Sequence, residues 1–559
     1  MAVKLQLTNK IIKMRKISTT ISLCIFSLKI IAQTVNFTYS NLPIVIINTN
    51  GTIIPDDPKI TANMKIIFNG PGQINNMSDQ NFHFDGIVGI EKRGSSSQFI
   101  SEKKPYSIEV RDLLGNDLAM PLLGMPSESD WALIAPYSDK ALIRDALTYN
   151  LAGSFMAWAP RTRFCELVVN GDYRGVYVLT EKIKRDKSRA NISKSDSTVT
   201  TGDALTGGYI LKIDKTTGNV PGITAGFYSA YSNSDTNANR KTLYQYEYPS
   251  LDDIKSAQKT YIQTTVASME QAMTLSNPSF SDPSVGYPKY WDVQSLIDFF
   301  IVNELTRNVD GYRLSTFFYK DRNSVSSKFK MGPVWDFNIA FGNANYCDGA
   351  RISNWAVDFN NVCPNDGWGI PFWWKNLMAD NNFKKQIRSR WQQLRTKELS
   401  NTRINYVIDS MTLALGEAPN RNFQKWKILG VYVWPNPFIG ATFDSEITYL
   451  KSWLTNRIAW IDGQIATFPV GQQEILDKIS VSPNPSVSGF NFDYLLKNPQ
   501  TVNLFIFNEL GQLVYQKTEQ QGSGNQQIRW YDPQAARGLY FYEIKTNAQR
   551  SAIGKIVKN

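Results

Sequence analysis

The stretches that decide the fold are IVNELTRNVDGYRLSTFFYKD (residues 301–321) and MGPVWDFNIAFGNANY (residues 331–346). The first has the apolar spacing of a helix at its start and an aromatic, β-branched run at its end. It predicts a helix that passes through Asp310 into a strand. The second predicts an apolar strand that ends at Trp335. Together they indicate that helices and strands belong to one domain.

Three polar side chains in these stretches suit a phosphate-transfer site. Asp336 and Asn338 lie two residues apart, so in an extended chain both point to the same side. Carboxylate and amide oxygens suit Mg²⁺, which is usually held by one or two protein groups together with phosphates. Asp310 would accept the proton of an attacking hydroxyl or act as a second metal ligand. The ordinary alternative is that aspartates at strand ends cap turns.

Outward from this region the chain changes from strands to helices. Upstream runs such as IVIINTNG and IVGIEKRGSSS predict strands, and helical patterns dominate after residue 255. The expected helices lie around Lys255–Leu275, Val293–Arg307, Pro371–Leu413 and Ser445–Ile465. Strands followed by helices indicate an α+β domain with two lobes, and a cleft between lobes is the default ligand site.

A second candidate region lies in EKRGSSSQFISEKKPYSIEVRD, residues 91–112. Arg93, Gly94 and Ser95 open a turn of small residues, which exposes backbone N–H groups to phosphate. Lys104, at the start of the next strand, would supply a positive charge to phosphate oxygens. Taken alone, a Gly/Ser turn is usually only a turn.

The order of the motifs resembles that of the CotH family, whose fold is a distant, two-lobed relative of protein kinases. The resemblance spans roughly residues 38–465. Its motifs are Arg93-Gly94-Ser95-Ser96-Ser97, Lys103-Lys104-Pro105-Tyr106, Asp130-Trp131, Arg144-Asp145, Asn170–Tyr177, Glu181-Lys182-Ile183, Gly207-Gly208-Tyr209, Asp310-Gly311-Tyr312 and Trp335–Asn338.

The resemblance implies a kinase that uses ATP with Mg²⁺ or Mn²⁺ to phosphorylate a protein, with Ser or Thr acceptors. It implies that Asp310 is the catalytic aspartate and that Asp336, with Asn338, binds the metal. Some members of the family carry a second aspartate where Asn338 stands, so metal binding here should be weaker. Arg93, Gly94, Ser95, Lys104 and Glu181 are expected at the nucleotide, Lys104 on the phosphates and Glu181 near the adenine or an ion pair.

The two ends of the chain indicate export. Residues 1–32 have a basic start, a short apolar run and a small residue before Gln33, as in a signal peptide. Residues 478–559 read as a small β-sandwich that resembles the type IX secretion sorting domain, on Ser482–Pro485, the Phe507–Gly511 turn and the basic tail. We expect domains at 1–32, 38–470 and 478–559, handling by the type IX machinery, and a place outside the cell or on its surface, reached through the periplasm and outer membrane.

Composition excludes several other classes. The chain has one histidine, His83, which rules out a His-rich zinc site. Part of the +11 net charge lies in the basic start, so we expect no nucleic-acid partner. No other apolar run approaches the length of a membrane span, so the mature chain should have none.

The cysteines suggest one covalent link. Cys347 and Cys363 bracket a short polar loop, and in an exported protein we expect them to form a disulfide. A metal pair is the alternative, but no further cysteine or nearby histidine completes it.

Two other functions stay open at this point. A non-catalytic surface or matrix protein would keep the same fold for binding, and would not need Asp310 or Asp336 for phosphate transfer. A glycan-active enzyme would use two carboxylates and aromatic platforms, for which the chain offers 14 tryptophans.

Overall fold

The computed structural model describes residues 35–196, 198–216, 226–233, 237–469, 479–496, 499–546 and 551–559. The chain divides into two compact units, Met1–Phe468 and Pro469–Asn559. The expected signal peptide, residues 1–32, lies outside the described residues. The first unit mixes helices and strands throughout, so the α+β class is confirmed.

Seven of the described strands in the first unit close a barrel. Its order is β2 (Ile44–Asn48), β3 (Ile60–Ile67), β5 (Phe84–Lys92), β6 (Tyr106–Arg111), β7 (Asp130–Ile134), β9 (Asp172–Glu181) and β8 (Thr162–Val169). All neighbours are antiparallel except β2 and β8, which run parallel and close the barrel. Apolar side chains including Val88, Ile108 and Trp131 fill the interior.

Tight turns set the register of the barrel strands. Asn170 and Gly171 join β8 to β9 with φ of 51° and 78°. Positive φ at both positions is the geometry of the two-residue hairpin turn that Asn-Gly favours. The sequence NGDYRG therefore fixes this hairpin locally.

The described part of the first unit also contains a five-stranded antiparallel sheet. Its order is β11 (Gly226–Ser232), β12 (Lys241–Tyr248), β10 (Tyr209–Ile213), β13 (Thr316–Lys320) and β14 (Phe329–Met331). The helix α6 (Val293–Thr306) precedes β13, as the sequence predicts. The connection from α6 to β13 carries Asp310, and the segment after β14 carries Asp336.

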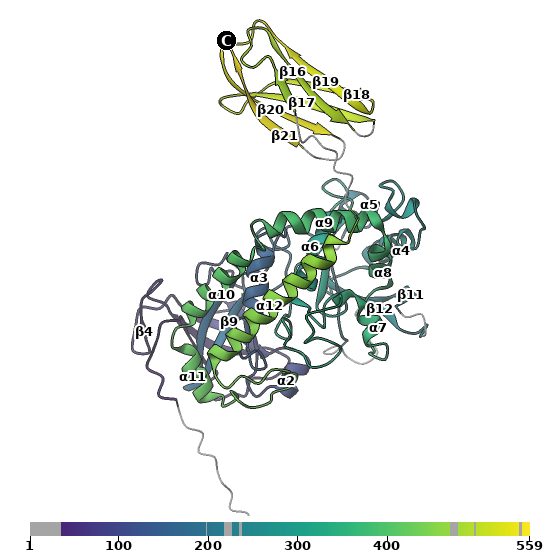
Figure 1. Cartoon of the computed structure of the whole chain (residues 1–559). Coiled ribbons are helices and arrows are strands. Elements are labelled where there is room, and N and C mark those ends of the chain that lie inside the picture. Colours follow the sequence, from purple (N-terminus) through teal and green to yellow (C-terminus); the bar gives the residue numbers. More distant parts are fainter. Residues whose placement is uncertain are drawn as a thin grey trace, which may run out of the picture. The chain divides into compact units, whose positions relative to one another are not determined.

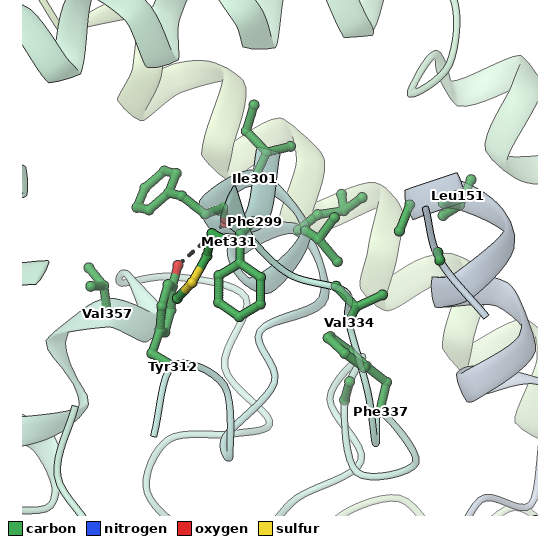
Figure 2. Close-up of a cluster of buried hydrophobic side chains, with 14 of the residues drawn as sticks. Leu151, Phe299, Ile301, Tyr312, Met331, Val334, Phe337 and Val357 are labelled. Atoms are coloured by element: carbon green, nitrogen blue, oxygen red, sulfur yellow. Dashed lines mark hydrogen bonds between the residues drawn. The ribbon is translucent and has the colours of Figure 1, made fainter. Parts of the chain in front are cut away.

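The first unit also contains helices, which are concentrated in its second half. They include α2 (Ser96–Ile100), α3 (Arg144–Gly153), α4 (Ser256–Ala272), α5 (Tyr287–Tyr290), α7 (Phe359–Val362), α8 (Phe372–Ala379), α9 (Asn381–Arg395), α10 (Asn401–Leu415), α11 (Ala418–Lys425) and α12 (Phe443–Ala466). The longest described helix, α12, packs against α6, α9 and α10 (Figure 1). Figure 2 shows part of the apolar core, in which the ring of Phe299 of α6 lies 5.8 Å from that of Tyr312 between centroids.

Side chains of α12 hold loops that come much earlier in the chain. The Tyr449 hydroxyl donates to the Gly342 carbonyl at 3.1 Å, and the Trp453 indole donates to the Ala350 carbonyl at 2.8 Å. Arg457 forms a buried ion pair with Glu304 of α6 at 3.0 Å. This helix therefore completes the packing around both segments that carry the candidate aspartates.

The described strands of the second unit form two antiparallel sheets (Figure 1). One has the order β15 (Ser480–Ser482), β16 (Gly489–Leu496) and β19 (Gly524–Tyr531), and the other β18 (Leu513–Gln521), β17 (Gln500–Asn508), β20 (Gly538–Thr546) and β21 (Ser551–Lys558). Phe490, Phe492 and Trp530 belong to its own apolar core. Among the described helices of the whole chain, none is long and apolar enough to cross a membrane.

Candidate functional site

A cavity of about 280 Å³ opens in the first unit between the barrel and the five-stranded sheet. The barrel side contributes residues that follow β5 and β7: Arg93, Gly94, Ser95, Ala135, Tyr137 and Ser138. The sheet side contributes residues that follow β10 and β14 or precede β13: Asp214, Lys215, Asp310, Ser315, Trp335, Asp336 and Asn338. Six of the residues singled out from the sequence therefore line one cavity.

Asp310 is held firmly in the connection between α6 and β13. Its carboxylate accepts a hydrogen bond from Arg313 Nη2 at 2.7 Å. Arg313 is buried and also pairs with Asp366 at 3.2 Å. The Asp310 N–H donates to Asn308 Oδ1 at 3.2 Å. One oxygen of Asp310 is thus occupied, and its position on the cavity wall is fixed from two sides.

Asp336 was expected directly after a strand, but a loop separates it from the nearest one, β14. The prediction that this strand reaches Trp335 is wrong, because β14 ends at Met331 and Pro333 has no N–H to continue a ladder. Asp336 has φ of 64°, a left-handed conformation that is costly for a residue other than glycine. Such strain persists only where the surroundings impose it, and it concentrates at functional sites.

The surroundings of Asp336 do impose this conformation. Its N–H donates to the Tyr149 hydroxyl at 3.0 Å, and its carbonyl accepts from Asn308 Nδ2 at 3.1 Å. The next N–H, of Phe337, donates to Asp145 Oδ1 at 2.6 Å. Tyr149 and Asp145 both belong to α3, so a buried helix fixes the turn from below.

Burial, helped at two positions by neighbouring negative charge, disfavours the ionised forms of carboxylates at and beneath the cavity. Partial loss of solvation in the cavity, followed by the charges of Asp310 and Asp214, raises the pKa of Asp336, although this residue stays accessible to solvent. Burial, followed by the charge of Asp336, raises the pKa of Asp145. Burial also raises the pKa of Asp214. A cation placed among these carboxylates would relieve the repulsion, since opposite charge favours the ionised forms.

The donors fit a magnesium-type ion in part. Asp336 and Asn338 offer hard oxygens at the cavity wall. The carbonyl of Asn338 accepts from Asn343 Nδ2 at 2.8 Å, which anchors that side of the loop. Within the described ranges, no group of three or more His, Cys, Asp or Glu side chains is arranged to hold a metal ion. Mg²⁺ does not need such a group when phosphates and water complete its shell.

The barrel side offers groups suited to an anion. The Arg93 guanidinium lies over the Trp335 ring, 5.0 Å from its centroid. Its Nη1 is buried and has no hydrogen-bond partner among the described residues. Burial lowers the pKa of Arg93, and the nearby Tyr149 and Asp336 oppose that shift. Gly94, with φ of 87°, then turns the chain into α2.

Lys104 and Glu181 lie away from this cavity. Lys104 Nζ donates to the carbonyls of Gln98 and Ser101, at 2.7 and 2.5 Å. Glu181 is fully buried at the end of β9 and pairs with Arg161 at 2.7 Å. Both side chains are occupied by structural contacts in the barrel half of the unit.

Comparison with known families agrees with the motifs. The family model described as CotH kinase protein matches residues 90–461, and the one described as secretion system C-terminal sorting domain matches residues 480–559. The chain belongs to the CotH kinase protein family. No match was found among curated proteins. The sorting domain marks this CotH protein for type IX secretion, which exports it from the cell or displays it at the surface.

Cys347 and Cys363 are joined by a disulfide in this CotH protein, with their Cα atoms 5.7 Å apart. The bridge flanks the cavity through its neighbours. Tyr346, which precedes Cys347, lines the cavity and stacks on Trp434 with ring centroids 5.6 Å apart. The disulfide therefore closes a loop that begins directly after an aromatic residue of the cavity wall.

Sequence reasoning missed several lining residues of the CotH cavity. Asp214 and Lys215 end the segment GGYILKIDK, and this pattern of a buried strand ending in Asp-Lys was the available signal. Tyr346 and Trp434 are far apart in the chain, so no local pattern brings them together. Asp145 was part of a motif, but its position beneath Asp336 depends on how α3 packs.

Proposed function

We propose that this CotH protein is a secreted kinase that transfers the γ-phosphate of ATP to a Ser or Thr hydroxyl of a protein. The observation that carries the proposal is the single cavity lined by Asp310, Asp336 and Asn338 on one side and Arg93 on the other. It combines a base, oxygen donors for a cation and a cationic group whose Nη1 has no hydrogen-bond partner among the described residues, which are the parts that phosphoryl transfer requires.

In this proposal the barrel half and the sheet half act as the two lobes of a kinase-like domain. The cavity takes its walls from both, which supports this division. We further propose that residues 1–32 act as the export signal, residues 38–470 as the catalytic domain and residues 478–559 as the sorting domain. The acceptor protein is then one that meets the enzyme outside the cytoplasm.

Each side chain has a defined task. Asp310 accepts the proton of the acceptor hydroxyl. At the same time the hydroxyl oxygen bonds to the γ-phosphorus of ATP, and the bond between that phosphorus and the oxygen that leaves with ADP breaks. Arg313 holds the Asp310 carboxylate in place at 2.7 Å. Asp336 and Asn338 hold Mg²⁺ or Mn²⁺, which when bound neutralises charge on the phosphate oxygens.

The nucleotide contacts follow from the barrel side. Arg93 donates to phosphate oxygens, and Gly94 and Ser95 offer backbone N–H groups at the same wall. For Lys104 the proposed role is indirect: it binds the Gln98 and Ser101 carbonyls and so holds the C-terminal part of α2, the helix that follows Ser95. Glu181 would act through its ion pair with Arg161, which stabilises the barrel wall.

The test is autophosphorylation of the chain without residues 1–32, with labelled ATP and Mg²⁺ or Mn²⁺. Asp310→Ala and Asp336→Ala should each lower incorporation by roughly 10²–10⁴-fold. Asp409→Ala is the matched control, because this aspartate of α10 has a side chain 62% exposed and does not line the cavity. It should incorporate label like the wild type.

Two results would contradict the proposal. Equal labelling of Asp310→Ala and the wild type would show that Asp310 is not the catalytic base. Absence of label from every protein, together with no shift of the unfolding temperature by nucleotide, would favour the non-catalytic binding protein.

A further inference from the structure

One buried side chain connects the two aspartates of the proposed site directly. Asn308 is 4% exposed and lies just after α6. Its Oδ1 accepts the N–H of Asp310 at 3.2 Å, and its Nδ2 donates to the carbonyl of Asp336 at 3.1 Å. The two aspartates are 26 positions apart in the chain, and no covalent constraint nearby sets their separation. The amide of Asn308 spans the gap with both of its polar ends.

The opposite side of Asp336 is held by a different element. The Tyr149 hydroxyl accepts the Asp336 N–H at 3.0 Å, and the Tyr149 ring stacks on Trp335 with centroids 5.9 Å apart. The Asp336 peptide groups are therefore bonded in both directions, to α6 through Asn308 and to α3 through Tyr149. A left-handed residue needs this double attachment, since a single bond leaves the chain free to relax.

We propose that Asn308 is a positioning residue that fixes Asp310 relative to Asp336, with Tyr149 holding the far side of Asp336. The inference rests on the proposed function, in which Asp310 takes the proton and Asp336 binds the cation. Asn308 does not line the cavity, so it acts through the two aspartates. A group that orients a metal ligand from behind typically contributes 10–100-fold to metal affinity or activity.

The chain offers a close control for Asn308. Asn75, which lies outside the cavity, is 0% exposed; its Oδ1 accepts the Asn69 N–H at 2.7 Å and its Nδ2 donates to the Leu42 carbonyl at 2.9 Å. It thus makes the same kinds of bond between two backbone segments. Asn308→Ala and Asn75→Ala should both destabilise the fold, but only the first should change the site.

The experiment measures binding of Mn²⁺ in the presence of ADP to the purified chain by calorimetry, together with the unfolding temperature. Asn308→Ala should weaken Mn²⁺ binding by roughly 10–100-fold and lower kcat more than it changes KM for ATP. Tyr149→Phe, which keeps the stacked ring, should weaken Mn²⁺ binding in the same direction. Asn75→Ala should leave Mn²⁺ binding and kcat unchanged below its unfolding temperature.

Each outcome bears on the inference. If Asn308→Ala, folded, binds Mn²⁺ as Asn75→Ala does, the positioning role is overturned. If Asn308→Ala does not fold, wild-type affinity in Tyr149→Phe overturns it instead. A wild type that binds Mn²⁺ with ADP but transfers no phosphate defeats the proposed function alone, because the affinity comparison still decides the role of Asn308. A wild type that binds neither Mn²⁺ nor ADP would contradict both the proposed function and the positioning role of Asn308.

Discussion

Two neighbouring lysines before β6 differ in burial and hold different segments. Lys103 is 1% exposed, and its Nζ donates to the Val176 carbonyl and, at 2.8 Å, to Asn422 of α11. Burial lowers the pKa of Lys103 to about 7. Lys104, one residue on, is half-buried and donates to the carbonyls of Gln98 and Ser101. Lys103 therefore ties the barrel to α11.

The lowered pKa of Lys103 predicts a pH dependence of stability. In the unfolded chain this amine keeps its ordinary pKa of 10.5, so between about pH 7 and 10.5 the unfolded state binds more protons than the folded state. The free energy of unfolding should therefore rise with pH in this window, by at most about 1.4 kcal/mol per unit. Lys103→Met should remove this rise.

Urea unfolding of both proteins at pH 6, 7, 8 and 9 measures the effect. Above pH 7 the free energy of unfolding of the wild type should rise relative to that of Lys103→Met. A difference between the two free energies that is the same at every pH would contradict the assignment of the lowered pKa to Lys103.

At this scale the sequence predicted much of the site. Asp310, Asp336, Asn338 and the Arg93 turn are marked by residue type and by their place after apolar runs. Lys104 was expected on the phosphates but does not line the cavity. A shift of one residue in an extended chain reverses the direction of a side chain, so the sequence does not show which way this lysine points. The bridging role of Asn308 depends on a contact with Asp336 that no local pattern reveals.

Among the elements, helices were predicted better than the strand before the site. Helix α6 occupies nearly the expected range, whereas Pro371–Leu413 consists of three helices. The breaks carried local signals, since Asp380 and Ser400 cap the backbone N–H groups of Phe383 and Arg403. Strand β14 is shorter than expected because its apolar run continues into a loop that packs in the core, as Val334 and Phe337 do in Figure 2.

The disulfide loop gives a prediction for one such element. The Cys347–Cys363 bridge spans 16 positions, and closing a loop of that size restricts the unfolded chain. Cys347→Ser/Cys363→Ser should lower the free energy of unfolding by about 3 kcal/mol. Nucleotide binding should also weaken, because Tyr346 and Asp366 flank the bridge.

Denaturant unfolding with and without dithiothreitol checks this prediction. Reductant should lower the stability of the wild type to that of the double variant and leave the variant unchanged. Equal stability of wild type and variant without reductant would show that the loop is held by its other contacts.

The molecule as a whole consists of units with separate cores. The first is held by the apolar residues of the barrel and the helical half, and the second by Phe490, Phe492, Trp530 and their neighbours. The sequence indicated this division by a change of pattern near residue 478. The sequence could not predict how the barrel half packs against the sheet half, because that packing joins segments as far apart in the chain as Arg93 and Trp434.

Because the two units have separate cores, we expect that export by the second unit and phosphate transfer by the first can be lost independently. A chain that ends at Phe468 should keep the unfolding temperature and any phosphate transfer of the first unit, and should lose display at the cell surface or release into the medium. Trp530→Ala, which removes a buried ring of the second unit at a cost of roughly 3–5 kcal/mol, should impair export alone. Fractionation and immunoblotting, with activity measured on purified protein, check both outcomes.

The position of α12 has a consequence for the timing of biosynthesis. A ribosome delivers a chain from its N-terminus. The loops that carry Asp310 and Asp336 emerge more than a hundred residues before Tyr449, Trp453 and Arg457, which fasten them. All residues that line the cavity are therefore synthesised before α12, the helix that holds these loops in place. A chain that terminates before α12 lacks the contacts that complete the packing around the cavity.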